Sequence, residues 1–225
     1  ARVVAPLISQ FYFDLHTTHG AGIVLGAMVS ELAGLDNKIT AVKTKDGREF
    51  PADLVLVGIG VIPNAEIAQA AGLEVEGGIV VDACGRSSDP AIVAAGDCTA
   101  RRMNDGSLRR LESVQNALEQ GKSAATAMLG HERPFNAAPW FWSDQYDVKL
   151  QMAGLTAGFD QVATRGDPTT NRFSAYYFKG EKLIAVDSLN HPGDHMLARK
   201  FFDKGISPTV EQATDSAFDL NSLLT

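Results

Sequence analysis

The chain has 225 residues, with 20 Lys and Arg side chains against 27 Asp and Glu side chains and a formal net charge of −7. This acidic balance argues against nucleic acid as the main partner, because phosphate binding needs a positive surface. A hydrophobic fraction of 45% and a charged fraction of 21% exclude disordered, collagen-like and disulfide-stapled chains. The length corresponds to about one and a half domains, and no apolar run is long enough to span a bilayer.

Cysteine and histidine usage gives no sign of a metal centre. Cys84 and Cys98 are the only cysteines, and they form no CxxC pair. His191 and His195 are four residues apart, but no third ligand accompanies them. We therefore expect no metal and a reducing, cytoplasmic location. The start at Ala1 lacks an initiator Met, and we expect that the beginning of the chain is missing.

The first quarter of the chain predicts one helix and several strands. Apolar residues at helical spacing predict a helix over residues 6–20. Short β-branched runs predict strands at 23–25 and 39–44, and Asp46-Gly47 is typical of a tight hairpin turn. The run at 53–60 is apolar without alternation, which predicts a strand covered on both faces in an α/β fold.

The middle of the chain alternates between strands and helices. Residues 65–71 predict a short helix, and 79–81 and 91–95 predict buried strands. Ser113 can cap a longer helix that Gly130 ends. The apolar positions of that helix repeat every three to four residues around a polar gap, at Val114, Ala117, Leu118, Ala125 and Met128.

From Pro134 onward aromatic residues and β-type segments dominate, which predicts a second domain of the α+β class. Four strands are expected, at 149–153, 162–165, 174–178 and 183–189. The last two are joined by a turn at residues 179–181. Helices are expected over 195–202 and 217–224.

Three local patterns could bind a ligand. Gly58-Ile59-Gly60 fails as a dinucleotide fingerprint because Pro63 replaces the third small residue, so it is either a tight strand end or a surface for a ligand. Asp97 follows Gly96 at a predicted strand end, where its carboxylate suits the hydroxyls of a polyol chain or caps nearby backbone. The helix that begins after Ser113 offers free N–H groups and a positive dipole end.

Nothing in the sequence predicts a catalytic nucleophile. No GxSxG pattern or other Ser/His/Asp signature is present, so acyl transfer is disfavoured.

Motifs spread over nearly the whole chain carry a family resemblance. In order they are Ala52-Asp53-Leu54-Val55, Gly58-Ile59-Gly60, Ile62-Pro63-Asn64, Ala71-Gly72-Leu73, Ser88-Asp89-Pro90, Ala95-Gly96-Asp97-Cys98, Glu112-Ser113-Val114, Asn116-Ala117 and Pro139-Trp140-Phe141-Trp142-Ser143-Asp144-Gln145. Together they resemble the carboxyl-terminal part of the FAD-dependent ferredoxin reductases of bacterial oxygenase systems.

The resemblance implies an α/β fold with parts of two Rossmann-like nucleotide-binding domains followed by an α+β carboxyl-terminal domain. Residues 1–61 resemble the second half of the NAD-binding domain. Residues 62–130 resemble the returning segment of the FAD-binding domain, and residues 131–225 resemble the reductase carboxyl-terminal domain.

The resemblance also implies the cofactors and the residues that bind them. Gly96 and Asp97 would bind the ribitol region of FAD, the Val114 backbone would meet the flavin carbonyl edge, and Trp142 would lie beside the isoalloxazine. Gly60 and Glu112 would lie near the nicotinamide of NAD(H). The reaction implied is hydride transfer from NADH to FAD, followed by single-electron transfers to a [2Fe-2S] ferredoxin.

The family's two glycine-rich phosphate loops would lie upstream of Ala1, so we expect this chain alone to bind FAD and NAD weakly or not at all. Arg109, Arg110, Lys122 and Trp142 are the predicted docking residues for the ferredoxin, unless the cations are simply solvated surface charges.

Two other functions stay open from the sequence. One is an NADH-dependent reductase of the same family with another acceptor, such as rubredoxin. The other is a folded interaction module without flavin, whose carboxyl-terminal domain forms a homodimer or a partner surface.

Overall fold

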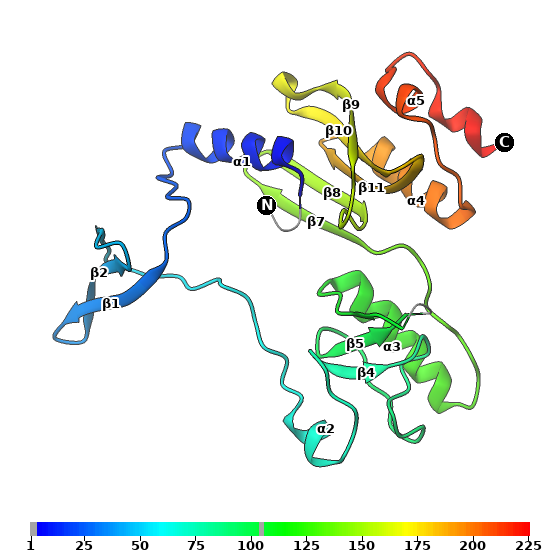
Figure 1. The fold of residues 1–225 in the computed structure, drawn as a ribbon, viewed down its shortest axis with the longest axis horizontal. Coiled ribbons are helices and arrows are strands. Elements are labelled where there is room, and N and C mark those ends of the chain that lie inside the picture. The colour runs from blue at the N-terminus through cyan, green and yellow to red at the C-terminus, as the bar shows by residue number, and fades with distance from the viewer. Residues whose placement is uncertain (1–3, 104–105) are drawn as a thin grey trace. The chain divides into compact units, whose positions relative to one another are not determined.

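The computed structural model describes residues 4–103 and 106–225, and the chain divides into two compact units (Figure 1). One unit is Pro6–Ile62, and the other combines Ala1–Ala5 with Pro63–Thr225. The chain is mixed α/β, as the sequence predicts.

The Pro6–Ile62 unit contains helix α1 (Pro6–Thr18) and a sheet of three antiparallel strands, β1 (Val29–Leu35), β2 (Lys38–Thr44) and β3 (Glu49–Pro51). The predicted helix and the predicted strand at 39–44 are confirmed. The predicted hairpin turn also forms, and Gly47 supplies its positive φ of 86°, which a side chain would disfavour.

Two strands predicted for this unit are wrong. Residues 23–25 and 53–60 form no strand, and the first strand is instead β1, which the sequence did not predict. Leu54, Leu56 and Ile59 are 87–94% exposed. An apolar run becomes a buried strand only when neighbours satisfy its backbone groups, and no strand pairs with 53–60 in the described part of the chain.

The segment after Pro63 contains helix α2 (Glu66–Ala70) and a three-stranded sheet made of β4 (Ile79–Val81), β5 (Thr99–Arg102) and β6 (Leu108–Arg109). Strand β4 runs parallel to β5, and β6 is antiparallel to β5. The predicted helix at 65–71 and the predicted strand at 79–81 are confirmed.

The strand predicted at 91–95 is wrong. In that stretch only Val93 forms an isolated bridge, to Arg86. The neighbour of β4 is β5, and the backbone N–H of Ile79 donates to the Cys98 carbonyl at 2.8 Å. The strand that pairs with β4 therefore lies downstream of the predicted one, after a turn, and it is more polar than the apolar run at 91–95.

Helix α3 (Val114–Met128) confirms the predicted capped helix, because the Ser113 side chain accepts a hydrogen bond from the Asn116 backbone N–H. In α3 the apolar positions that the pattern predicts to be buried are exposed, and polar positions between them are buried. Val114 and Leu118 are 57% and 60% exposed, whereas Asn116 and Gln120 are buried. Polar contacts, described below, decide which face of α3 turns inward.

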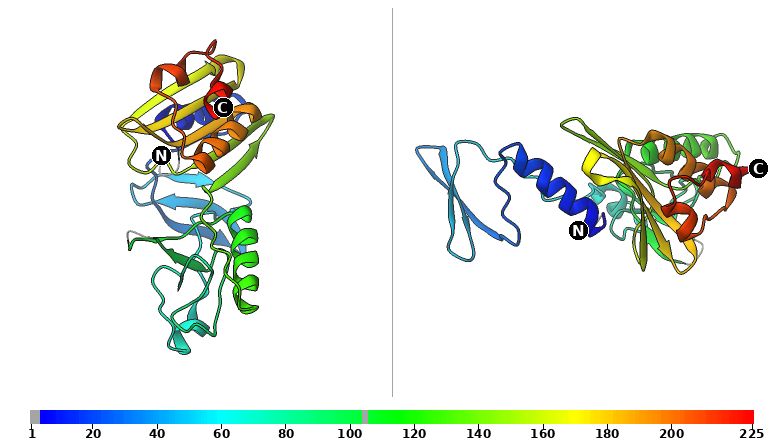
Figure 2. Two further views of the ribbon diagram at one scale, coloured as in Figure 1. Left: turned by 90° about the vertical axis from the view of Figure 1, so that its right-hand side faces the viewer. Right: turned by 90° about the horizontal axis from the view of Figure 1, so that it is seen from above.

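The remainder of the unit that contains Pro63–Thr225 is a five-stranded antiparallel sheet with helices (Figures 1 and 2). The strands are β7 (Trp140–Gln145), β8 (Val148–Gly154), β9 (Gln161–Asp167), β10 (Arg172–Lys179) and β11 (Lys182–Leu189), in the spatial order β7-β8-β11-β10-β9. The helices are α4 (Pro192–Lys204), α5 (Val210–Thr214) and two short 3₁₀ helices, η1 (Pro168–Thr170) and η2 (Leu220–Leu224).

The core of the five-stranded sheet lies between the sheet and α4, which packs against β8 and β11. Tyr176, Phe178 and Val186 from the strands meet Leu197 and Phe201 from α4. All four predicted strands and the helix predicted at 195–202 are confirmed. The sequence did not predict β7 or α5, and the predicted helical tail is a 3₁₀ helix over its last five residues.

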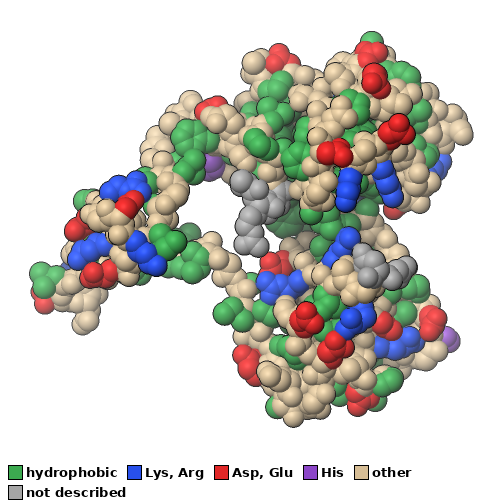
Figure 3. All heavy atoms as spheres, in the orientation of Figure 1, with side chains coloured by type: hydrophobic (Ala, Val, Ile, Leu, Met, Phe, Trp, Pro, Cys, Tyr) green, Lys and Arg blue, Asp and Glu red, His purple; other side chains and the backbone are tan. Residues whose placement is uncertain are grey.

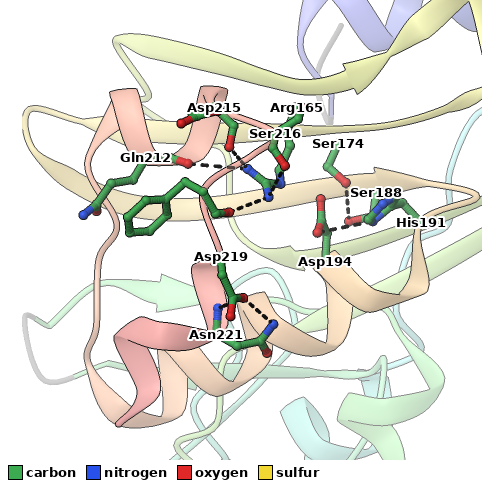
Figure 4. Close-up of polar contacts among 11 residues, drawn as sticks. Arg165, Ser174, Ser188, His191, Asp194, Gln212, Asp215, Ser216, Asp219 and Asn221 are labelled. Atoms are coloured by element: carbon green, nitrogen blue, oxygen red, sulfur yellow. Dashed lines mark hydrogen bonds and ion pairs between the residues drawn. The ribbon is translucent and has the colours of Figure 1, made fainter.

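Arg165 on β9 holds α5 and the segment after it through its guanidinium group (Figure 4). Nη1 donates to the carbonyls of Gln212 (3.5 Å) and Asp215 (2.5 Å), and Nη2 donates to those of Ser216 (3.4 Å) and Phe218 (2.9 Å). A planar cation with several fixed donors suits this cluster of carbonyls.

We expect Arg165→Ala to lower the free energy of unfolding by about 2–3 kcal/mol, because four carbonyls lose a charged donor. Urea denaturation followed by tryptophan fluorescence measures this. Arg172→Ala, at an exposed arginine in β10, is the matched control and should change stability little. Equal effects of the two substitutions would contradict the role of Arg165.

Candidate functional site

A buried polar network joins α3 to the loop at Gly96 and Asp97. Gln120 Oε1 accepts hydrogen bonds from the Gly96 N–H (2.8 Å), the Thr99 hydroxyl (3.0 Å) and Asn116 Nδ2 (3.3 Å). Asn116 Nδ2 also donates to the carbonyl of Leu111 at 2.8 Å, which fixes the chain entering α3. The network thus holds the loop and the start of the helix together.

The loop itself is shaped by Gly96, whose φ is 87°. A Cβ on Gly96 would lie 3.6 Å from Cβ of Ala117, so the loop packs directly on the first turns of α3. The carboxylate of Asp97 is exposed beside it. Asp97 and the amino-terminal end of α3 near Val114 therefore lie at one edge of the β4–β6 region.

That edge fits a neutral polyol joined to a ring whose carbonyl edge carries negative charge. The Asp97 carboxylate can accept hydrogen bonds from hydroxyl groups, and the start of α3 offers a positive dipole end. The exposed side chains of Val114 and Leu118 add apolar surface next to it. The residues present thus fit the part of FAD that the sequence predicted them to bind.

A groove begins at this helix end. It measures about 430 Å³ and is called the α3 groove below. Glu112 and Ser113 line one side of it, and Trp140, Phe141 and Asp187 from the five-stranded sheet line the other. The predicted nicotinamide residue Glu112 forms an ion pair of 3.1 Å with Arg110.

Trp142 belongs to a cluster of aromatic rings on and beside β7. Its ring centroid lies 5.6 Å from that of Trp140 and 6.2 Å from that of Phe141. The Trp140 ring also contacts the Arg199 guanidinium, at 4.9 Å, and the ring of His195, at 5.7 Å. Trp142 is 36% exposed within this aromatic cluster, and it is not among the described residues that line the α3 groove.

The predicted docking cations lie on two elements. Arg109 is in β6 and Arg110 follows it, whereas Lys122 lies within α3 and forms an ion pair of 2.6 Å with Glu119. That contact lowers the pKa of the Glu119 carboxyl, since both Lys122 and Arg133 donate to it. The two arginines therefore adjoin one another, and Lys122 is already paired.

Gly60 lies in the other unit, in the extended segment after β3. Its φ is 105° and nothing would meet a Cβ there. The two proposed nicotinamide residues thus come from different units, Gly60 from Pro6–Ile62 and Glu112 from Pro63–Thr225.

A buried carboxyl, Asp187, also borders the α3 groove. It accepts a hydrogen bond of 2.5 Å from the Tyr177 hydroxyl, and that hydroxyl accepts one of 3.3 Å from the Ala5 N–H. Burial raises the pKa of Asp187 to about 7, although the bond from Tyr177 opposes the rise. Sequence reasoning missed this carboxyl, because nothing local marks an aspartate in a β-rich run as buried.

The histidines do not form a metal site. Burial, followed by the nearby Arg199 charge, lowers the pKa of His195 to about 4, so its ring is neutral at pH 7. His191 Nδ1 lies 3.2 Å from an Asp194 oxygen. In residues 4–103 and 106–225, no group of three or more His, Cys, Asp or Glu side chains could hold a metal ion.

Two family models match the chain. The model described as pyridine nucleotide-disulphide oxidoreductase matches residues 1–121, and the one described as reductase C-terminal matches residues 140–224. The first match covers more than half of the chain. The chain belongs to the pyridine nucleotide-disulphide oxidoreductase family.

Similar proteins support the finer resemblance to ferredoxin reductases within this oxidoreductase family. Rhodocoxin reductase of Rhodococcus erythropolis is 43% identical over 98% of this chain and 52% of its own length. Putidaredoxin reductase CamA of Pseudomonas putida is 45% identical over 85% of this chain and 46% of its own length. The chain spans about half the length of the curated relatives it matches.

Solved structures agree with this family assignment and confirm the predicted fold class. A ferredoxin reductase from Rhodopseudomonas palustris matches all of this oxidoreductase chain and 56% of its own, with 45% identity and a TM-score of 0.96. The reductase in a covalent putidaredoxin reductase–putidaredoxin complex matches 99% of this chain and 54% of its own, with 39% identity and a TM-score of 0.93. No helix among the described residues could cross a membrane.

The raised pKa of Asp187 predicts that stability falls as pH rises. The unfolded carboxyl has a pKa near 3.8 and the folded one a pKa of about 7. Between these values only the unfolded state releases its proton, so the free energy of unfolding decreases from about pH 4 to about pH 7 and then levels off.

Asp187→Asn should flatten that slope and raise stability by about 2 kcal/mol at pH 8, because the amide needs no ionisation and still accepts from Tyr177. Urea denaturation between pH 4 and pH 8 measures both effects. Asp147→Asn, at an exposed aspartate, serves as the control. A slope that persists in the Asp187 variant would refute this assignment.

Proposed function

We propose that this chain is the carboxyl-terminal part of an NADH-dependent, FAD-containing ferredoxin reductase. The observation that carries the proposal is the Gln120 network, since it holds the Gly96–Asp97 loop against the start of α3. The family membership and the ferredoxin reductases among the similar proteins support it.

The proposed domain division follows the resemblance. Residues 1–61 form the second half of an NAD-binding domain, residues 62–130 the returning segment of an FAD-binding domain, and residues 131–225 the carboxyl-terminal α+β domain. The two family models, with their boundaries at residues 121 and 140, support a division near the end of α3.

In the proposed mechanism the residues of this chain bind, orient and shield. Asp97 accepts hydrogen bonds from ribitol hydroxyls, while Gly96 keeps the loop close enough for that contact. The start of α3 at Val114 would stabilise negative charge at the carbonyl edge of the ring. Trp142 would lie beside the ring. FAD, when bound, supplies the exchange between two-electron and one-electron transfer.

Gly60 and Glu112 are the proposed nicotinamide neighbours. Arg110 pairs with Glu112 at 3.1 Å, which fixes the carboxylate beside the α3 groove. No side chain of this chain is needed as a nucleophile in the proposed reaction.

The proposed partner is a [2Fe-2S] ferredoxin, which docks at Arg109, Arg110, Lys122 and Trp142. Charge complementarity supports this, because the two arginines stand together in a chain of net charge −7. We also propose a cytoplasmic location, which the two free cysteines Cys84 and Cys98 support, and a homodimer as the oligomeric state. A rubredoxin is the alternative acceptor.

One observation favours a second, non-enzymatic candidate, in which the chain is an interaction module without flavin. The apolar run at residues 54–62 is exposed, with Leu54, Leu56, Ile59 and Ile62 each 87% exposed or more. Such a surface is typical of a site that another polypeptide covers.

Titration of the 225-residue chain with FAD tests the proposal. We expect weak uptake or none, because the chain lacks a glycine-rich phosphate loop ahead of a helix. Co-expression with the amino-terminal half of a similar reductase should give a flavin spectrum, and Asp97→Ala should weaken FAD binding about tenfold by removing one charged acceptor.

Asp89→Ala, at another exposed loop aspartate, is the matched control for Asp97. Tight stoichiometric uptake by the chain alone would contradict the expected weakness. A reconstituted pair that holds no flavin would contradict the proposed function and favour the interaction module.

Reversal of Arg109 to Glu in a flavin-containing protein should slow ferredoxin reduction about tenfold at low salt, because the acceptor is no longer attracted, while the Arg110–Glu112 ion pair is left intact. NADH-to-dye activity should be retained. Arg172→Glu, at an exposed arginine in β10 away from this surface, is the control for added negative charge. Equal losses with ferredoxin and with the dye would argue against docking at Arg109.

A further inference from the structure

A second groove, next to the α3 groove, is cationic. It measures about 720 Å³ and is lined by Arg109 and Arg110 on one side and by Lys179 and Lys182 of the β10–β11 hairpin on the other. No acidic side chain lines it among the residues that the structure describes. Lys and Arg side chains gather on both sides of this region in Figure 3. We call it the cationic groove.

The four cations have little compensation. Arg110 pairs with Glu112, but Arg109, Lys179 and Lys182 have no ion-pair partner in the described part of the chain. Arg109 also stands directly opposite Arg101 in the β5–β6 pairing. Like charges in facing positions destabilise a sheet, so an anion in this groove would relieve repulsion.

The walls between the cations are apolar. Leu183, Ile184 and Phe202 lie on the side of the sheet and α4, and Leu108 and Leu111 lie on the side of β6. A neutral hydrogen-bonding side chain is absent from the lining described here. The groove therefore combines several positive charges with apolar surface, and it has few groups that could read a ligand's hydrogen-bond pattern.

We propose that the cationic groove binds a small phosphorylated ligand with a flat aromatic ring, of the nucleoside diphosphate class. The diphosphate lies among Arg109, Lys179 and Lys182, where charge-assisted hydrogen bonds are strong. The ring packs on the wall that contains Leu183 and Phe202. Because that wall carries no neutral polar side chain, the site accepts different bases about equally.

This groove adjoins the α3 groove, but it is lined by other residues than those proposed to bind the dinucleotides. None of the residues proposed for FAD or NAD lines the cationic groove, namely Gly60, Gly96, Asp97, Glu112, Val114 and Trp142. A volume of about 720 Å³ is typical of small-molecule sites, which favours a small ligand over an acidic polypeptide. Arg109 and Arg110 also belong to the proposed docking surface, so the test changes only the two lysines.

Calorimetric titration of the chain with GDP at low salt tests the proposal. We expect binding that weakens as salt is added, with ADP bound within about threefold of GDP. The double variant Lys179→Gln with Lys182→Gln should weaken binding at least about tenfold, because two charged donors are removed. Lys149→Gln, outside the groove, should bind as the unchanged chain does, and thermal unfolding checks that each variant is folded.

Three results would overturn the proposal. The first is no binding of GDP, or binding that the double variant leaves unchanged. The second is inorganic pyrophosphate that binds as tightly as GDP, since the apolar wall would then contribute nothing. The third is a poly-glutamate peptide that displaces GDP and binds more tightly, which would make the groove a site for an acidic polypeptide.

Discussion

The side-chain oxygen of Gln120 is the point on which the candidate site depends. It is buried and takes three hydrogen bonds, from the Gly96 backbone, the Thr99 hydroxyl and the Asn116 amide. Leaving such an acceptor unpaired costs about 1–3 kcal/mol, so the loop and α3 are stabilised only in this mutual arrangement. The same contacts turn the polar face of α3 inward, which leaves Val114 and Leu118 exposed beside Asp97.

The two grooves meet at the segment that enters α3. Arg110 and Leu111 line both of them, while Glu112 lines only the α3 groove. The ion pair between Arg110 and Glu112 therefore lies at the point where a cationic groove passes into one that is bordered by carboxyl groups. The charge of the lining therefore changes within one connected surface.

Local patterns predicted much of the site. The Ser113 cap, the glycine before Asp97 and the arginines before Glu112 are visible as short motifs, since each has a local conformational or electrostatic cause. Asn116 and Gln120 were visible only as a polar gap in the helix pattern. Asp187, Lys179 and Lys182 gave no signal, because they reach the grooves through strand pairing and helix packing across long stretches of sequence.

The sequence by itself determined the helices with clear caps, the hairpin strands and the membership in an oxidoreductase family, because periodicity, turn residues and ordered motifs act locally or accumulate along the chain. The tertiary structure alone decided the fate of the apolar runs at 53–60 and 91–95, which form no strand in it. It also decided which face of α3 is buried. The physical reason is common to these cases: whether a backbone or side-chain polar group finds a hydrogen-bonding partner depends on segments distant in sequence, and those segments are brought together, or not, only when the chain folds.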